Sequence, residues 1–98
     1  MALQGLDDFR TLIRRIDGTH TPVALFVFDG DPYDPDPVAR AAYAREHLGT
    51  GAPLLVIERP AGITGHGGAN GDVFNGRYGA CVLDFFAAPR PGIAHCPE

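Results

Sequence analysis

Three carboxylates stand at the ends of apolar runs, where side chains of α/β proteins often do chemistry. Asp29 and Asp31 follow residues 23–28, and Glu58 follows residues 54–57. Parallel neighbouring strands bring their carboxyl ends to one edge of a sheet, which is the usual ligand site in open α/β folds. Carboxylate oxygens are the ligands that Mg²⁺ prefers. The spacing therefore predicts a ligand site in which Asp29, Asp31 and Glu58 would also hold Mg²⁺ or Mn²⁺ if a metal is bound.

A glycine-rich stretch, residues 60–79, follows the second run and carries His66 and Asn70. Its first part is expected to be a surface loop that leaves the same edge of the sheet. His66 would then serve as a general base or as an extra metal ligand, and Asn70 would contact the ligand. The backbone of such a loop can also bind anions. Residues 64–68, however, have neither the lysine of a phosphate-binding loop nor the dinucleotide-binding spacing.

A purely structural interpretation of the same residues stays open. Aspartate and proline in residues 29–37 make turns and cap helices, and His66 would then be an exposed loop residue. The chain has neither a G-x-S-x-G nor a C-x-x-C motif, which argues against a serine nucleophile and a thioredoxin-type site. We therefore predict a small soluble binding or interaction protein without a cofactor. The alternative is a hydrolase or phosphotransferase that depends on a divalent metal at the acidic edge.

Apolar periodicity indicates the elements that would position these side chains. Residues 6–16 have one apolar face, which predicts an amphipathic helix. Residues 23–28 and 53–59 contain solid apolar runs, as expected of strands covered on both faces. Residues 37–48 are predicted to form the helix between them, with Asp36 as its N-cap. Strand, helix and strand together predict a parallel βαβ unit with a right-handed crossover.

The chain after residue 71 is predicted to form an antiparallel hairpin. Asn75 and Gly76 favour a type I′ turn, and residues 77–86 alternate as the last strand of a sheet would. The residues expected in the core are Leu25, Val27, Leu55, Ile57 and Leu83.

The predicted fold class is therefore α/β: a small single-domain α-β-α-β unit with parallel strands, a glycine-rich loop and a C-terminal antiparallel hairpin. Residues 1–88 are expected to form the domain, and residues 89–98 a proline-rich tail. The open edge of residues 77–86 would pair with a second copy of the chain, so we expect a homodimer. The identity of any other partner, small molecule or protein, is not encoded in these patterns.

Composition argues against several partners and compartments. The 98 residues carry a formal net charge of −4, which argues against nonspecific nucleic-acid binding. The apolar runs are too short to span a membrane and the N-terminus has no signal-peptide pattern, which favours a cytoplasmic location. Two cysteines are too few for a disulfide scaffold. Cys81 is expected to be a small core residue, and Cys96 to lie in a mobile tail.

Overall fold

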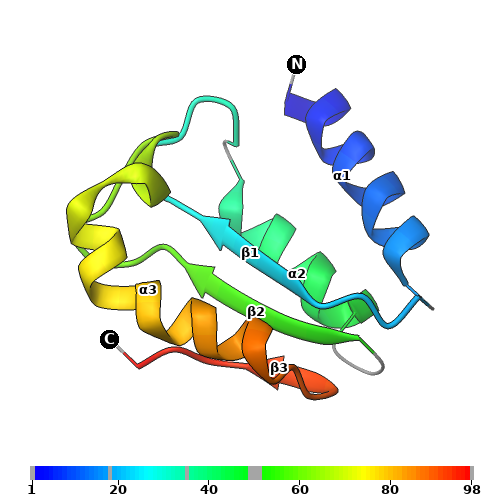
Figure 1. The fold of residues 1–98 in the computed structure, drawn as a ribbon. Coiled ribbons are helices and arrows are strands. Elements are labelled where there is room, and N and C mark those ends of the chain that lie inside the picture. The colour runs from blue at the N-terminus through cyan, green and yellow to red at the C-terminus, as the bar shows by residue number, and fades with distance from the viewer. Residues whose placement is uncertain (1, 18, 35, 49–51, 98) are drawn as a thin grey trace.

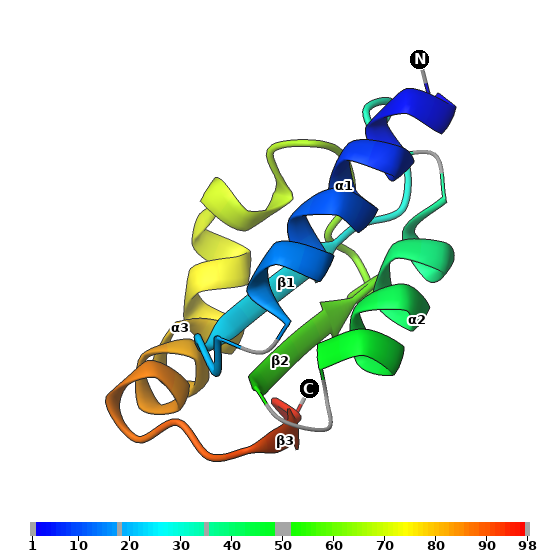
Figure 2. The same cartoon turned by 90° about the vertical axis from the view of Figure 1, so that its right-hand side faces the viewer.

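The computed structural model describes residues 2–17, 19–34, 36–48 and 52–97 (Figure 1). Its elements are α1 (Ala2–Ile16), β1 (Val23–Val27), α2 (Pro37–Leu48), β2 (Pro53–Glu58), the 3₁₀ helix η1 (Gly68–Asn70), α3 (Asp72–Ala87) and β3 (Gly92–Ala94). Within these residues the strands form one parallel sheet in the order β1-β2-β3. Helices α1 and α2 cover one face of the sheet and α3 covers the other (Figures 1 and 2). None of the described helices is long and apolar enough to cross a membrane.

The first half of the chain confirms the predicted α/β class. β1 and β2 pair in parallel, with Val27 opposite Glu58 at their carboxyl ends, and the crossover through α2 is right-handed (Figure 1). The side chain of Asp36 caps α2 by accepting a hydrogen bond from the Ala39 N–H at 3.1 Å. The residues that follow β1 and β2 therefore start from one rim of the sheet.

The predicted C-terminal hairpin is wrong, because its residues form the helix α3. Phe74, Tyr78 and Phe85 are buried and recur at helical spacing, so one face of the helix carries all three. A strand would send Phe85 to the side opposite Phe74, because side chains alternate along a strand. Leu83, which was expected in the core, is 72% exposed on the outer side of α3.

The strand that completes the sheet comes from residues predicted to be a tail. β3 pairs with the first half of β2, up to Leu55 opposite Ala94. The strand order runs in one direction while α2 and α3 lie on opposite faces, so the crossovers through these helices have opposite hands. The crossover through α3 is therefore left-handed, which is uncommon for parallel strands. A disulfide between Cys81 on α3 and Cys96 just after β3, with Cα atoms 5.9 Å apart, covalently links the helix to the segment that follows the strand.

The same disulfide overturns the expectations for the cysteines. Cys81 is not an unpaired core residue, and Cys96 is not in a mobile tail, because it packs against the apolar cluster under α3. The division into a domain of residues 1–88 and a tail of residues 89–98 stays a prediction. Part of that tail, however, is the sheet strand β3.

The glycine-rich stretch is not the surface loop that was predicted, because Thr64 pairs with Asp29 and residues 68–70 form η1. Thr64 makes an isolated parallel bridge with Asp29, and the Gly65 N–H donates to the Asp29 carbonyl at 2.8 Å. Further on, Gly68 begins η1 in close contact with the sheet, since a Cβ there would lie 3.0 Å from the Phe28 ring. The segment that carries His66 is therefore held against the end of β1.

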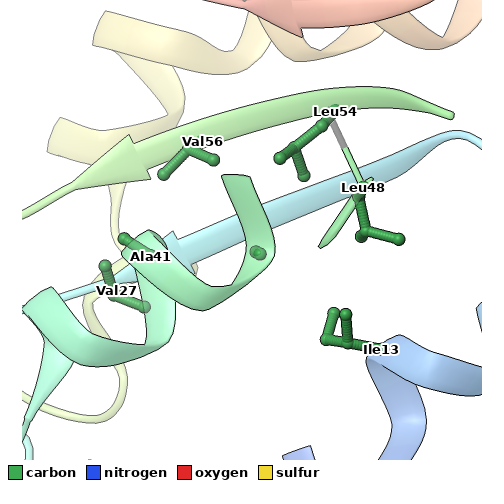
Figure 3. Packing of buried hydrophobic residues seen from close by; sticks show 7 residues of the cluster. Ile13, Val27, Ala41, Leu48, Leu54 and Val56 are labelled. Atoms are coloured by element: carbon green, nitrogen blue, oxygen red, sulfur yellow. The ribbon is translucent and has the colours of Figure 1, made fainter. Parts of the chain in front are cut away.

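Apolar clusters fill both faces of the sheet. On the side of α1 and α2, small alanines let α2 pack closely on the strands (Figure 3); the buried members are Ile13, Val27, Ala41, Ala44, Leu48, Leu54 and Val56. On the side of α3 the buried members are Phe28, Ile57, Ile63, Phe74 and Tyr78. The expected core residues Val27, Leu55 and Ile57 are buried. Leu25 is only half-buried, because β1 lies at an edge of the sheet.

Candidate functional site

The structure divides the predicted site residues between two cavities beside β1 and β2. The β1 cleft has a volume of about 380 Å³, and its polar lining residues are Asp31, Tyr33, Asp34, Arg40 and His66. The β2 notch has a volume of about 440 Å³, and besides the end of β2 it is lined by Asp29, Arg45, Arg59, Tyr78 and Cys96. Asp31 and His66 therefore share one cavity, and Asp29 and Glu58 share the other. Asn70 is exposed and lines neither.

The β1 cleft has an apolar wall because β1 is an edge strand. Leu25 and Phe26 are half-buried, since within the described chain β1 has a neighbouring strand on one side only. Phe9 from α1 and Ala69 from η1 extend the wall. The cleft thus offers an apolar surface that the protein's own sheet does not cover.

An Asp–His pair stands at the polar end of the β1 cleft. Asp31 Oδ2 lies 3.2 Å from His66 Nδ1, and the Tyr33 N–H donates to Asp31 Oδ1 at 2.9 Å. Burial of Asp31 acts to raise its pKa, but the hydrogen bonds from Tyr33 and His66 and the charge of His66 together lower it below the ordinary value. An ionised Asp31 orients the imidazole, and the Nε2 of His66 is then left for a ligand.

The pKa of a second carboxylate in the cleft, Asp34, is shifted in the opposite direction. Asp34 Oδ1 lies 2.8 Å from Arg40 Nε, and both side chains are largely buried. Burial raises the pKa of Asp34 above its ordinary value, even though the positive charge of Arg40 acts to lower it. Carboxyl groups whose environments push their pKa values apart are suited to different roles in one site. Asp31 is the stronger acceptor, and Asp34 is the group that holds a proton more readily.

In the β2 notch, arginines neutralise the predicted metal ligands. Asp29 Oδ1 lies 2.7 Å from Arg59 Nε, and Glu58 Oε1 lies 2.7 Å from Arg45 Nη1. The hydrogen bond and the negative charge of Asp29 raise the pKa of the exposed Arg59 guanidinium. Arg59 itself has a left-handed backbone conformation, with φ 51°, which is uncommon outside glycine.

The ion pairs of Asp29, Asp31 and Glu58 argue against the predicted metal site. Asp29, Asp31 and Glu58 each have a cationic or imidazole partner from this chain, so a metal ion would have to displace those partners. In the described ranges, no group of three or more His, Cys, Asp or Glu side chains is arranged to hold a metal ion. Binding of Mg²⁺ or Mn²⁺ by the three carboxylates stays a prediction, and the observed ion pairs do not favour it.

Sequence reasoning missed the arginines that complete both cavities. Arg59 is next to Glu58 in the chain but pairs with Asp29, and Glu58 pairs instead with Arg45 on α2. The usable signal was charge, because clustered carboxylates need cations nearby, and α2 carries Arg40 and Arg45. Tyr78 was missed for another reason, since its segment was taken for a strand.

Comparison with known protein families, with curated proteins and with solved structures found no match for this chain. The function is therefore inferred from the geometry of these cavities.

Proposed function

We propose that this is a small binding protein whose β1 cleft takes an organic ligand with an apolar body and a hydroxyl or amino group. The observation that carries this proposal is the Asp31–His66 pair at one end of an apolar wall. The cleft volume of about 380 Å³ lies in the range of small-molecule sites. Such sites are mostly apolar and use a small number of polar groups to orient the ligand, which matches this lining.

The polar groups of the cleft suit a ligand that donates hydrogen bonds. In the neutral form that carries its proton on Nδ1, His66 donates to Asp31 and presents Nε2 as a hydrogen-bond acceptor. Asp34 adds carboxylate oxygens that Arg40 holds in place. The apolar part of the ligand would then lie against Leu25 and the rest of the wall, where it gains the free energy of burying apolar surface.

Benzyl alcohol and toluene test this proposal, because they share a ring and differ by the hydroxyl group. We expect benzyl alcohol to shift the backbone amide NMR signals of β1 and Asp31 at lower concentration than toluene. His66→Gln should remove that preference. His47→Gln is the matched control and should keep it, because His47 packs on Tyr43 outside the cleft lining.

Two outcomes would contradict the proposal. One is that neither probe shifts the β1 signals at about 10 mM, because any dissociation constant would then lie well above that concentration. The other is that the preference for benzyl alcohol survives in His66→Gln.

A second candidate function is a hydrolase or phosphotransferase that depends on Mg²⁺ or Mn²⁺. The observation in its favour is that Asp31 orients His66 as a carboxylate orients a general base. On this proposal, Mg²⁺ or Mn²⁺ raises the melting temperature, as ligand linkage requires, and supports hydrolysis of p-nitrophenyl phosphate. Asp31→Asn should abolish both effects. Hydrolysis that is absent, or that is unchanged by the metal and by this substitution, would remove the candidate.

Association into a homodimer also stays a proposal, with a different edge from the one first expected. Residues 77–86 lie in α3, so they have no strand edge to offer. Within the described residues both β1 and β3 are edge strands, and the longer outer edge of β1 is the one that we expect a second copy to extend. Sedimentation velocity at high micromolar concentration distinguishes a monomer from a dimer, and a monomer would contradict this proposal.

The cytoplasmic location that the sequence favours stays a prediction, and the disulfide argues for a different compartment. The disulfide between Cys81 and Cys96 favours an oxidising compartment, because thiols in the cytosol are kept reduced. Quantifying the thiols of protein isolated from its native cells would decide between the two locations.

A further inference from the structure

The β2 notch exists because β3 stops before β2 does. β3 pairs with β2 only as far as Leu55 opposite Ala94, whereas β2 continues to Glu58. The chain after β3 no longer pairs with β2 but still borders the notch, because Cys96, which is bonded to Cys81 on α3, lines it. A cavity of about 440 Å³ occupies the place beside residues 56–58 that a longer third strand would fill.

The main chain of β2 has hydrogen-bonding groups directed into this place. The Arg59 N–H donates to the Val27 carbonyl at 2.7 Å, on the β1 side of the strand. In a trans peptide group the C=O points opposite to the N–H, so the Glu58 carbonyl points to the notch side. No described strand pairs with this side of β2 beyond Leu55. On this side, residues 56–58 of β2 therefore form an unpaired strand edge to which another strand can add.

Tyr78 adds a hydroxyl-bearing side chain to the notch. Its side chain is 2% exposed and lines the notch, with the ring packed at 5.1 Å from that of Phe74. Among the described residues no hydrogen bond involves its hydroxyl, so the hydroxyl can bond to a polar group that enters the notch.

The two arginines of the notch, each of which pairs with one acidic side chain, still have donors that fit a carboxylate. Arg59 reaches Asp29 through Nε and Arg45 reaches Glu58 through one terminal nitrogen, so each guanidinium retains further N–H donors. Asp29 and Glu58 thereby hold the two guanidinium groups in place. Arginine binds carboxylates in a bidentate geometry that lysine cannot provide. Arg45 comes from α2 and Tyr78 from α3, so donors approach the notch from both faces of the sheet.

We propose that the β2 notch binds the C-terminal end of an extended peptide. The peptide backbone adds to β2 beside residues 56–58, and its α-carboxylate binds Arg59, with the Tyr78 hydroxyl as an additional partner. Strand addition of this kind takes affinity from main-chain hydrogen bonds. A free carboxylate anion would use the arginine but not the strand edge, which separates the two kinds of ligand.

The test uses three probes and backbone amide NMR of the full chain. The probes are acetyl-Ala-Val-Ala with a free carboxylate, the same peptide with a C-terminal amide, and acetate. We expect the free-acid peptide to shift the signals of residues 56–59. The amidated peptide should bind at least about tenfold more weakly, and acetate should need far higher concentrations, because a tenfold change in affinity corresponds to one good interaction.

Three variants separate the contributions of the side chains. Arg59→Gln should remove the preference for the free acid over the amide, whereas Arg15→Gln, an exposed arginine on α1, should keep it. Tyr78→Phe removes only the hydroxyl, so it should weaken peptide binding several-fold without lowering the denaturation midpoint. A purely structural role of Tyr78 would not produce that combination.

The proposal is overturned if the peptide causes no shift at residues 56–59 up to about 10 mM. It is also overturned if the amidated peptide binds as well as the free acid, or if acetate binds as well as the peptide. None of these results depends on the β1 cleft, whose signals report separately on the benzyl alcohol experiment.

Discussion

The β1 cleft and the β2 notch lie beside adjacent strands of one sheet, yet they offer opposite kinds of surface. β1 is an edge strand over its whole length, so its apolar side chains form the wall of the cleft. β2 is the central strand and loses its neighbour only after Leu55, so its main chain and its charged end face the notch. The cleft suits an apolar ligand with one polar end, and the notch suits a peptide.

This difference shows how a small sheet can form two unlike cavities at one rim. Parallel strands bring their following residues to one rim, but the neighbours of each strand decide what is exposed there. Asp29 and Asp31 are two positions apart in the chain, and they nevertheless serve different cavities. Strand pairing, rather than sequence proximity, sorts the carboxylates.

The largest difference between the regions should appear in stability. Leu55 on β2 is fully buried, so Leu55→Ala should cost about 2–5 kcal/mol of unfolding free energy. Leu25 on β1 is half-buried, and Leu25→Ala should cost less than half as much because less apolar surface is lost. Urea denaturation of both variants measures these costs. Equal losses would mean that β1 is covered as fully as β2.

The disulfide should matter for the notch and not for the cleft. It closes a loop with a sequence separation of 15 residues, for which the chain-entropy estimate is about 3 kcal/mol. The double variant Cys81→Ala, Cys96→Ala should lose about that much stability and bind the test peptide less tightly. Binding of benzyl alcohol should not change. Reduction of the native protein with dithiothreitol is the control and should reproduce the loss; equal stability of both forms would contradict the prediction.

The smallest effect concerns the two carboxylates of the β1 cleft. The pKa of Asp31 is lowered on folding, so its contribution to stability is present above the unfolded pKa and is lost as the pH falls through the folded pKa. The pKa of Asp34 is raised, so its contribution has the opposite sign and declines as the pH rises through that window. Asp31→Asn should therefore flatten the loss of stability on acidification, and Asp34→Asn should steepen it.

Denaturation midpoints between about pH 2 and 6, where carboxyl groups titrate, measure these slopes. Asp36→Asn is a suitable control, because asparagine also caps helices and Asp36 lies outside both cavity linings. Slopes that change in the same direction for Asp31→Asn and Asp34→Asn would contradict the assignment of opposite roles.

Much of the first half of the fold was predictable because its signals are local. The apolar run of β1, the Asp36 cap and the alanine-rich face of α2 lie within one βαβ unit, and each indicates the same structure. The C-terminal half contains competing signals. Asn75 and Gly76 favour a turn in isolation, but only a helix brings Phe74 and Phe85 to the same face of the sheet.

The sequence by itself determined α1, α2, β1 and β2, the parallel pairing of β1 with β2, and the rim to which their following residues belong. Only the tertiary structure decided that residues 72–87 form α3, that Cys81 meets Cys96, and that Arg59 pairs with Asp29 across 30 positions of the chain. The physical reason is distance along the chain. Periodicity and caps act between residues within a turn or two, whereas ion pairs, disulfides and strand edges depend on which distant segments packing brings together.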